Sequence, residues 1–424
     1  MSDARAKPRL APLLLTVFID LLGFGLTIPL LPLYARTFGA TALQVTLLGA
    51  AYSAMQFVFV PVWSALSDRV GRRPVLLGSI AATAVSMALL GFARSYPELL
   101  LVRLLQGIAT ANIATAQAYI ADVTEADDRT RAMGMIGAAF GVGFILGPFV
   151  GGVLAHESAR LPGLAASALS LLNLALAWRG LPESVRVRAD AAPVDRWRVV
   201  REQLAMRSLR DAVRTPALGA LVVMSFLHVL SFTQLESTFA LHLCARLGFG
   251  MRETGFAFAL IGTVVAVVQG GFLGRAARRY GETALVRAGL TLLVAGMALS
   301  AMLPAAAGAN PACEGGLALA TLAARSTVLV AAIALTAVGN ALVTPSVSTL
   351  VSKVASRDGY GAVLGAQQSA GALARVLGPA TAGVVYERWG SAAPYWLACA
   401  GMIAALSTAW TLRAPGIDRG RDWA

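Results

Sequence analysis

The sequence predicts an all-α membrane protein with twelve transmembrane helices in two pseudo-symmetric six-helix halves. Three observations lead to this fold class. Of the 424 residues, 57% are hydrophobic and only 13% are charged, which is too apolar for a conventional water-facing surface. Apolar runs of about 20 residues, the length that crosses roughly 30 Å of hydrocarbon, recur along the whole chain. The two halves of the chain also repeat a common pattern of small and basic residues.

The apolar runs define the predicted spans, which follow one another with short connections. They cover residues 10–34, 43–66, 75–94, 97–122, 131–155, 161–178, 217–244, 253–274, 284–303, 326–351, 359–385 and 391–412. The long polar interruption at 180–215 carries charges of both signs and predicts a cytoplasmic linker. It separates an N-terminal half, residues 1–179, from a C-terminal half, residues 216–424.

The repeat between the halves is visible at matching positions. A shift of 210 residues aligns Gly71 with Gly281, whereas Gly147-Pro148 aligns with Gly378-Pro379 only at a shift of 231. The additional residues are expected in an outside loop at 304–324, which contains prolines and paired glycines.

The basic residues indicate orientation in the membrane. An N-terminus in the cytoplasm places 26 of the 35 Lys and Arg residues on the cytoplasmic side and 7 on the other, as the positive-inside rule requires. We therefore expect a multi-pass protein of the cell (inner) membrane with both termini in the cytoplasm. The net charge of +13 does not predict nucleic-acid binding, because the basic residues lie in short segments without interleaved aromatic residues.

Signatures of enzymes and ATP-driven pumps do not occur in the sequence. It contains no G-x-x-x-x-G-K-[ST], no HExxH and no GxSxG motif, and its three cysteines form no CxxC pair. We expect no catalytic residue, no metal and no cofactor. A non-transporting sensor on the same fold is a further alternative.

Charged residues inside predicted spans include Asp20, Arg103 and Glu236, and the two carboxylates are candidates for ion coupling. A carboxylate near the middle of a bilayer costs ~2.5 to 3.5 kcal/mol, so it should face the interior and have a partner or a proton. The alternatives are a permanently paired Asp20 and an Arg103 that extends to the outer interface. Further side chains expected to line a cavity are Gln56, Gln106, Asn112, Phe232, Gln234, Asn340 and Arg375.

Two other segments carry dense motifs. The second span is followed by Ser64-Ala-Leu-Ser-Asp68-Arg69-Val-Gly71-Arg72-Arg73, in which Gly71 permits a tight turn and Asp68 can accept hydrogen bonds. The segment could have a specific structural role at the cytoplasmic side, or it could be an ordinary loop whose basic residues only follow the positive-inside rule. The fifth span contains glycines that let a facing helix approach closely and a proline, Pro148, that should kink the helix. The alternative is ordinary helix packing. The glycines are Gly141, Gly143, Gly147, Gly151 and Gly152.

These segments together resemble the drug:proton antiporters of the major facilitator superfamily, and among them the tetracycline-resistance-like efflux proteins. The loop is similar to the superfamily signature G-x-x-x-D-R-x-G-R-R, with Ser64 in place of the first glycine. The fifth span resembles the antiporter glycine-proline signature. The segment from Asp20 to Pro32 and the pair Arg103 and Gly107 match signatures of the first and fourth spans.

The resemblance implies two halves that rock around a central cavity. It also implies a cytoplasmic latch at Asp68 and its neighbours, which closes that side in the outward-open state, and a proton-binding carboxylate that Arg103 tunes. One departure is that the third and ninth spans contain no Asp or Glu, which makes tetracycline itself a doubtful substrate.

We expect a monomer in the lipid bilayer that exports a small amphipathic compound or drug in exchange for protons. The alternative is proton-coupled uptake or uniport of a small metabolite on the same fold.

Overall fold

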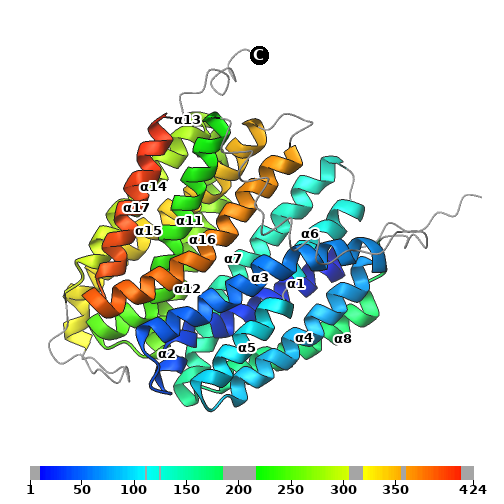
Figure 1. Ribbon diagram of the computed structural model, residues 1–424, viewed down its shortest axis with the longest axis horizontal. Helices are drawn as coiled ribbons and strands as arrows, with labels where there is room; N and C mark the ends of the chain where they lie inside the picture. The colour runs from blue at the N-terminus through cyan, green and yellow to red at the C-terminus, as the bar shows by residue number, and fades with distance from the viewer. Residues whose placement is uncertain are drawn as a thin grey trace, which may run out of the picture.

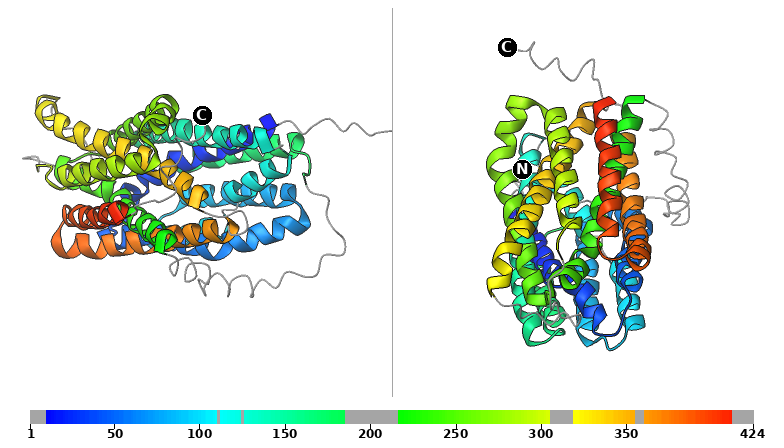
Figure 2. Two further views of the ribbon diagram at one scale, coloured as in Figure 1. Left: turned by 90° about the horizontal axis from the view of Figure 1, so that it is seen from above. Right: turned by 90° about the vertical axis from the view of Figure 1, so that its left-hand side faces the viewer.

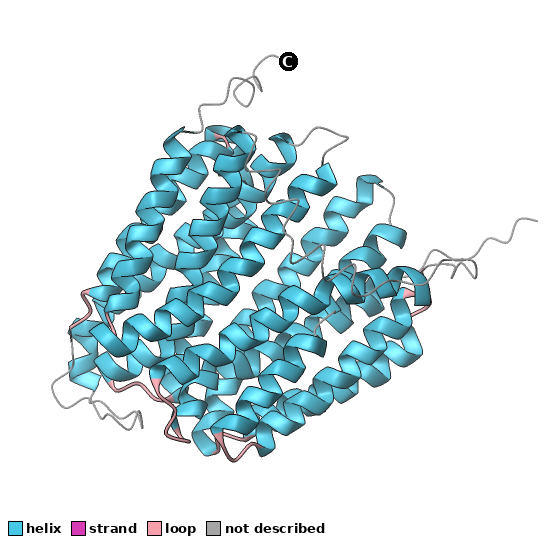
Figure 3. Ribbon diagram, viewed as in Figure 1, coloured by secondary structure: helices cyan, strands magenta, loops and turns pink. Residues whose placement is uncertain are grey.

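The computed structural model describes residues 10–109, 112–123, 126–184, 216–304, 319–354 and 360–411. Helices occupy nearly all of these residues, and the described part of the chain contains no strand (Figure 3). The predicted all-α fold class is confirmed.

The helices form two consecutive groups, labelled as in Figure 1. The first group is α1 (Leu10–Thr27), the 3-10 turn η1 (Ile28–Leu30), α2 (Leu31–Arg36), α3 (Ala42–Val70), α4 (Arg72–Phe92), α5 (Tyr96–Ala109), α6 (Asn112–Val123), α7 (Ala126–Glu157) and α8 (Leu161–Gly180). The second group is α11 (Pro216–Leu247), α12 (Met251–Val267), the π-helical turn η2 (Val268–Phe272), α13 (Leu273–Tyr280), α14 (Glu282–Ala301), α15 (Leu319–Val354), α16 (Tyr360–Trp389) and α17 (Ala393–Thr411).

Eight of these helices or continuous helical runs are long and apolar enough to cross a membrane. They are Ala11–Arg36, Ala42–Val70, Arg72–Phe92, Leu161–Gly180, Leu218–Leu247, Met251–Tyr280, Glu282–Ala301 and Thr327–Val351. The prediction of a multi-pass membrane protein is confirmed, whereas the count of twelve spans remains a prediction. The outside loop was predicted to end at residue 324, but α15 already begins at Leu319, so the loop ends earlier than predicted.

Matching turns in the two groups follow from the sequence repeat. Gly71 ends α3 with φ +104°, and its repeat partner Gly281 ends α13 with φ +77°. Positive φ is readily adopted only by glycine, so both helices turn back at these residues. The linker expected at 180–215 lies mostly outside the described residues, and its bounds remain a prediction.

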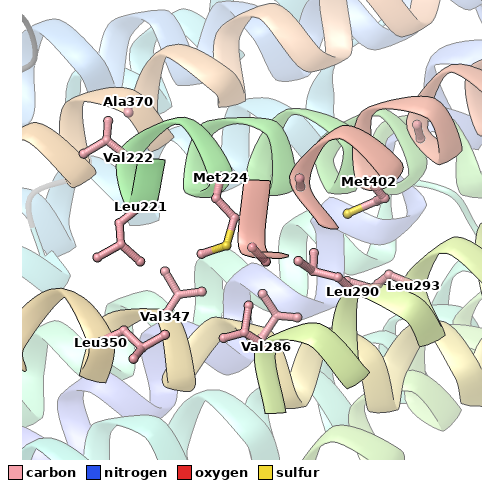
Figure 4. Close-up of a cluster of buried hydrophobic side chains, with 14 of the residues drawn as sticks. Leu221, Val222, Met224, Val286, Leu290, Leu293, Val347, Leu350, Ala370 and Met402 are labelled. Atoms are coloured by element: carbon pink, nitrogen blue, oxygen red, sulfur yellow. The ribbon is translucent and has the colours of Figure 1, made fainter. Parts of the chain in front are cut away.

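Buried apolar side chains form clusters in both groups of helices. In the second group, side chains of α11, α14, α15 and α17 meet around Met224, Leu290, Val347 and Met402 (Figure 4). Leu48, Met87 and Leu99 of the first group belong to a second cluster, which Leu241 of α11 also joins. Lipid is as apolar as leucine, so close van der Waals packing, rather than exclusion of water, holds such helices together.

The two groups lie side by side and contact each other mainly through α3 with α16 and α7 with α12 (Figures 1 and 2). These contacts reach the end of the bundle that the sequence predicts to be outside. A Cβ atom built on Gly152 would lie 3.1 Å from the Cα atom of Gly255, and the backbone N–H of Leu43 donates to Glu387 Oε1 at 2.9 Å. A cavity between the groups is therefore bounded on this side.

Candidate functional site

A cavity of about 290 Å³ lies between the two groups of helices. Side chains of α1, α3, α5 and α7 form one wall, and side chains of α11, α12 and α16 form the other. Much of the lining is apolar and includes Phe24, Phe144 and Phe258. The size and the mixture of apolar walls with a few polar groups are typical of small-molecule sites.

Four charged side chains line this cavity, two from each half. Asp20 comes from α1 and Arg103 from α5, while Glu236 comes from α11 and Arg375 from α16. With Gln56 from α3, five of the residues predicted from the sequence are brought together, although they are far apart in the chain. Two acidic and two basic side chains balance each other in formal charge.

Arg103 is held rigidly by its surroundings. It is 3% exposed, and its guanidinium donates to Gln106 Oε1 at 2.7 Å and to the Leu48 carbonyl at 3.3 Å. The guanidinium carbon also lies 4.2 Å from the centre of the Tyr52 ring, within cation–π distance. The alternative that Arg103 extends to the outer membrane interface is therefore wrong, because its side chain is buried between helices.

The position of Arg103 depends on close packing of α5 against α3. A Cβ atom on Gly107 would collide with the Tyr52 carbonyl oxygen, so a larger residue would push the helices apart. The Tyr52 hydroxyl accepts a hydrogen bond from Gln56 Nε2 at 2.9 Å. A polar network thus runs from the cavity wall at Gln56 through Tyr52 to Arg103.

Glu236 and Arg375 are held much less tightly. Both lie on the wall that the second half provides, and their side chains are exposed to the cavity. Each acts on the other electrostatically. Within the described residues, neither of these two side chains forms an ion pair or a hydrogen bond with the protein. Their charges are available to a ligand in the cavity.

Other predicted cavity residues lie elsewhere. Gln106 is buried behind Arg103, and its amide donates to Met87 Sδ at 3.5 Å. Gln234 is 3% exposed and donates to Thr381 Oγ1 at 3.4 Å. Two residues along a helix turn the side chain by about 200°, so Gln234 and Glu236 cannot face the same space.

Phe232, Asn340 and Asn112 also do not join the four charges. Phe232 packs against the apolar core of the second half. Asn340 Oδ1 lies 3.2 Å from His228 Nε2, inside the same half. Neither is among the residues that line the cavity. The side chain of Asn112 lies outside the described residues, and its predicted role is not tested.

The glycine motif of α7 packs against helices of both halves. Cβ atoms on Gly143, Gly147 and Gly151 would press against α1, with that of Gly147 2.6 Å from the Gly25 Cα atom. Gly141 and Gly152 instead face α12 of the second half. Pro148 lies inside the continuous helix α7. The motif therefore brings α7 close to the helix that carries Asp20 and to the neighbouring half.

The loop motif forms a compact charge cluster inside the first half. Arg72 pairs with Asp68 at 2.5 Å and with Asp122 of α6 at 3.0 Å. Arg73 donates to the Trp178 carbonyl at 2.7 Å, and Arg69 lies half-buried in the last turn of α3. In the described part of the chain, the partners of Asp68, Arg72 and Arg73 lie in the first half or, in the case of Glu183, just after it.

Glu183 completes this cluster and was not predicted. Its carboxylate accepts the backbone N–H groups of Arg72 at 2.8 Å and Arg73 at 3.2 Å, at the start of α4. A helix N-terminus favours such an anion. A Cβ atom on Gly71 would collide with this carboxylate, so the glycine is required for space as well as for its positive φ. The available signal was an acidic residue directly after Pro182, at the start of the predicted linker.

The geometry of a cavity between two helical halves agrees with comparisons to known proteins. The family model described as Major Facilitator Superfamily matches residues 13–313. The chain belongs to this superfamily. Its relatives in the superfamily include the class C tetracycline resistance protein of Escherichia coli, which is 34% identical over 289 residues, or 68% of this chain and 72% of that protein. Major facilitator superfamily domain-containing protein 10 of Homo sapiens is 31% identical over 414 residues, or 88% of this chain and 86% of the human protein.

Solved structures of the superfamily have the same fold. The human organic anion transporter MFSD10 (TETRAN) aligns with a TM-score of 0.69 at 27% identity, covering 94% of this chain and 98% of that one. The nucleoside transporter NupG aligns with a TM-score of 0.71 at 14% identity, covering 95% and 98%, which supports the fold alone. The predicted major facilitator fold and the resemblance to tetracycline-resistance-like proteins are confirmed, and the family and its members indicate a transporter in a lipid bilayer that binds a small molecule.

Proposed function

We propose that this protein is a proton-coupled secondary active transporter that exports a small amphipathic compound by alternating access. The observation that carries the proposal is the cavity between the halves, where Asp20, Arg103, Glu236 and Arg375 meet apolar and aromatic walls. Charges inside a membrane protein are costly and are usually kept where they act on a substrate or an ion.

Asp20 and Glu236 are the proposed proton carriers. A carboxylate transports a proton only if its surroundings alternate between favouring the neutral and the charged form. Arg103 is fixed by Gln106, Leu48 and Tyr52, so its charge stays in one place within the first half. A rocking movement that changes how Asp20 is exposed to this charge and to water would bias release of its proton.

The described conformation supports a state in which the cavity is closed toward the outside. The contacts between Gly152 and Gly255 and between Leu43 and Glu387 lie at the predicted outer end. Within the described residues, the loop cluster is bonded to the first half and to Glu183, so we propose that it does not latch the two halves together in this state. In the opposite state, we propose that Asp68, Arg69 and Gly71–Arg73 hold the cytoplasmic side closed.

The proposal includes the arrangement of the chain in the membrane. Twelve spans in two halves, a linker at 180–215, and both termini in the cytoplasm of a cell (inner) membrane account for the distribution of basic residues. The bacterial relatives named tetracycline resistance proteins support export and this location. We propose that the monomer is the functional unit, because the cavity is formed within a single chain.

The proposal is tested in two steps. Expression in an efflux-deficient bacterial host, with a panel of amphipathic compounds, should reveal compounds whose toxicity is lowered. The purified protein is then placed in vesicles with an internal pH indicator, and an identified compound is added. Antiport predicts proton movement opposite to the compound. Proton movement in the same direction would indicate coupled uptake, and compound flux without proton movement would indicate uniport.

A further inference from the structure

Glu236 and Arg375 are an unusual pair among the charges of the cavity. They come from neighbouring helices of the second half, α11 and α16, and both face the cavity. Each lies in the electrostatic field of the other, but they do not form an ion pair in the described structure. Two opposite charges that attract each other across open space leave room for a ligand that contacts both.

The other charged and titratable groups of the cavity are placed differently. Tyr52 and Arg103 belong to the first half: the Arg103 guanidinium lies over the Tyr52 ring, and each is hydrogen-bonded to a neighbour. Tyr52 also acts electrostatically on Arg375 across the cavity. Asp20 also lies on the wall that the first half provides. Arg103 and Arg375 both line the cavity, but their guanidinium groups differ. Within the part of the chain that the structure describes, the Arg103 guanidinium donates hydrogen bonds to the protein, whereas that of Arg375 donates none. A guanidinium with free donors favours a planar anion such as a carboxylate.

We propose that the preferred substrate is amphoteric, with a cationic group that binds Glu236, an anionic group that binds Arg375 and an aromatic body between them. Phe24, Phe144 and Phe258 line the same cavity and provide surfaces for such a body. This inference rests on the proposed function and assigns a substrate class to it.

The charge of the substrate would also determine whether its binding releases a proton from Glu236 or favours uptake of one. A cationic substrate group and a proton compete for the Glu236 carboxylate, so binding of the substrate releases the proton, as antiport requires. A substrate with only an anionic group would instead neutralise Arg375 and remove the counter-charge of Glu236. Glu236 would then hold a proton more readily, and substrate and proton would bind together. The cationic group therefore determines whether binding favours exchange.

Matched probes test this inference by equilibrium binding to the purified protein, without any gradient. Two fluorescent scaffolds, naphthylalanine and a piperazinyl quinolone carboxylic acid, are each used as the zwitterion, the cationic ester and the anionic N-acetyl derivative. At neutral pH, at least one zwitterion should bind about tenfold more tightly than both of its derivatives, since a close charge pair commonly contributes this much. Binding of that zwitterion should release protons into weakly buffered solution.

Two variants assign the preference to the two side chains. Arg375→Gln should abolish the advantage of the zwitterion over the ester but keep its advantage over the N-acetyl derivative. Glu236→Gln should have the reverse effect. Arg279→Gln, at the end of α13 and outside the cavity, is the control and should leave all three affinities unchanged. Retained binding of one derivative by each variant shows that the variant is folded.

The inference is overturned if neither zwitterion is preferred, if none of the probes binds, or if the preference survives both substitutions. These outcomes differ from failure of the proposed function. A protein with the charge preference that moves no protons in vesicles keeps the assigned substrate class and loses the coupling. A proton antiporter without the preference keeps the coupling and loses the substrate class.

Discussion

Each half of this transporter contributes one arginine to the cavity, and the two arginines differ in how tightly the protein holds them. Arg103 of the first half is 3% exposed and makes hydrogen bonds to Gln106 and Leu48, with Tyr52 under its guanidinium. Arg375 of the second half is exposed to the cavity and has no such bonds in the described residues. The difference indicates that a fixed charge shapes the electrostatic field of the site, whereas an open charge is available to bind a ligand.

The largest expected effect is on the free energy of unfolding, when each arginine is replaced by alanine. Arg103→Ala leaves the buried partners of the guanidinium unsatisfied and opens a cavity, so it should destabilise the protein by about 3 kcal/mol. Arg375→Ala removes an exposed side chain that has no hydrogen-bond partner among the described residues, and it should change stability by less than about 0.5 kcal/mol. Unfolding of both purified variants in the same detergent measures this, and equal losses would remove the distinction between the two arginines.

The turns at the ends of α3 and α13 provide a second comparison. Gly71 and Gly281 both have positive φ, but only a Cβ atom on Gly71 collides with a neighbouring group, the Glu183 carboxylate. Gly281→Ala should therefore cost about 1 to 2 kcal/mol from backbone strain alone, and Gly71→Ala should cost more.

Combining Gly71→Ala with Glu183→Ala should recover part of the additional loss, because the double variant removes the collision. Thermal unfolding of the four proteins, analysed as a double-mutant cycle, measures this coupling. Strictly additive losses would mean that Glu183 does not restrict this turn.

A smaller effect is expected from Tyr52→Phe, which keeps the ring under Arg103 and removes the hydroxyl that accepts from Gln56. We expect a loss of about 1 kcal/mol, typical of one hydrogen bond. Tyr52→Leu also removes the cation–π contact and should lose about 1 kcal/mol more. If both variants lose the same amount, the ring does not help to fix Arg103.

The smallest effect on stability is expected for Asp68→Asn, because Arg72 keeps its bond to Asp122. The substitution should instead shift the resting population toward the state that is open to the cytoplasm. Accessibility labelling from each side of the membrane measures this shift. Unchanged labelling together with normal transport would contradict the latch proposed for this motif.

The fold was predictable from the sequence because length and apolarity of the runs are local properties, and the turn at Gly71 repeats at Gly281. The four charged residues of the cavity were also predicted, since a charged residue inside an apolar run is conspicuous.

Gln234 was predicted to line the cavity, but its side chain instead donates a hydrogen bond to Thr381, while Glu236, two residues along the helix, faces the cavity. The polar character that the two residues share does not reveal that their side chains point in different directions. Glu183 was missed because its partners lie more than a hundred residues earlier in the chain. Such pairings depend on tertiary packing, which a linear pattern does not encode.

The central claim, that a carboxylate at the cavity couples transport to protons, is tested most directly with Asp20→Asn in vesicles. Wild-type protein and the variant are compared with a compound identified by the growth screen. The variant should lose accumulation driven by an imposed pH gradient and keep downhill exchange of the compound, because the amide mimics a permanently protonated carrier. Full gradient-driven accumulation by Asp20→Asn would contradict this assignment of the proton site.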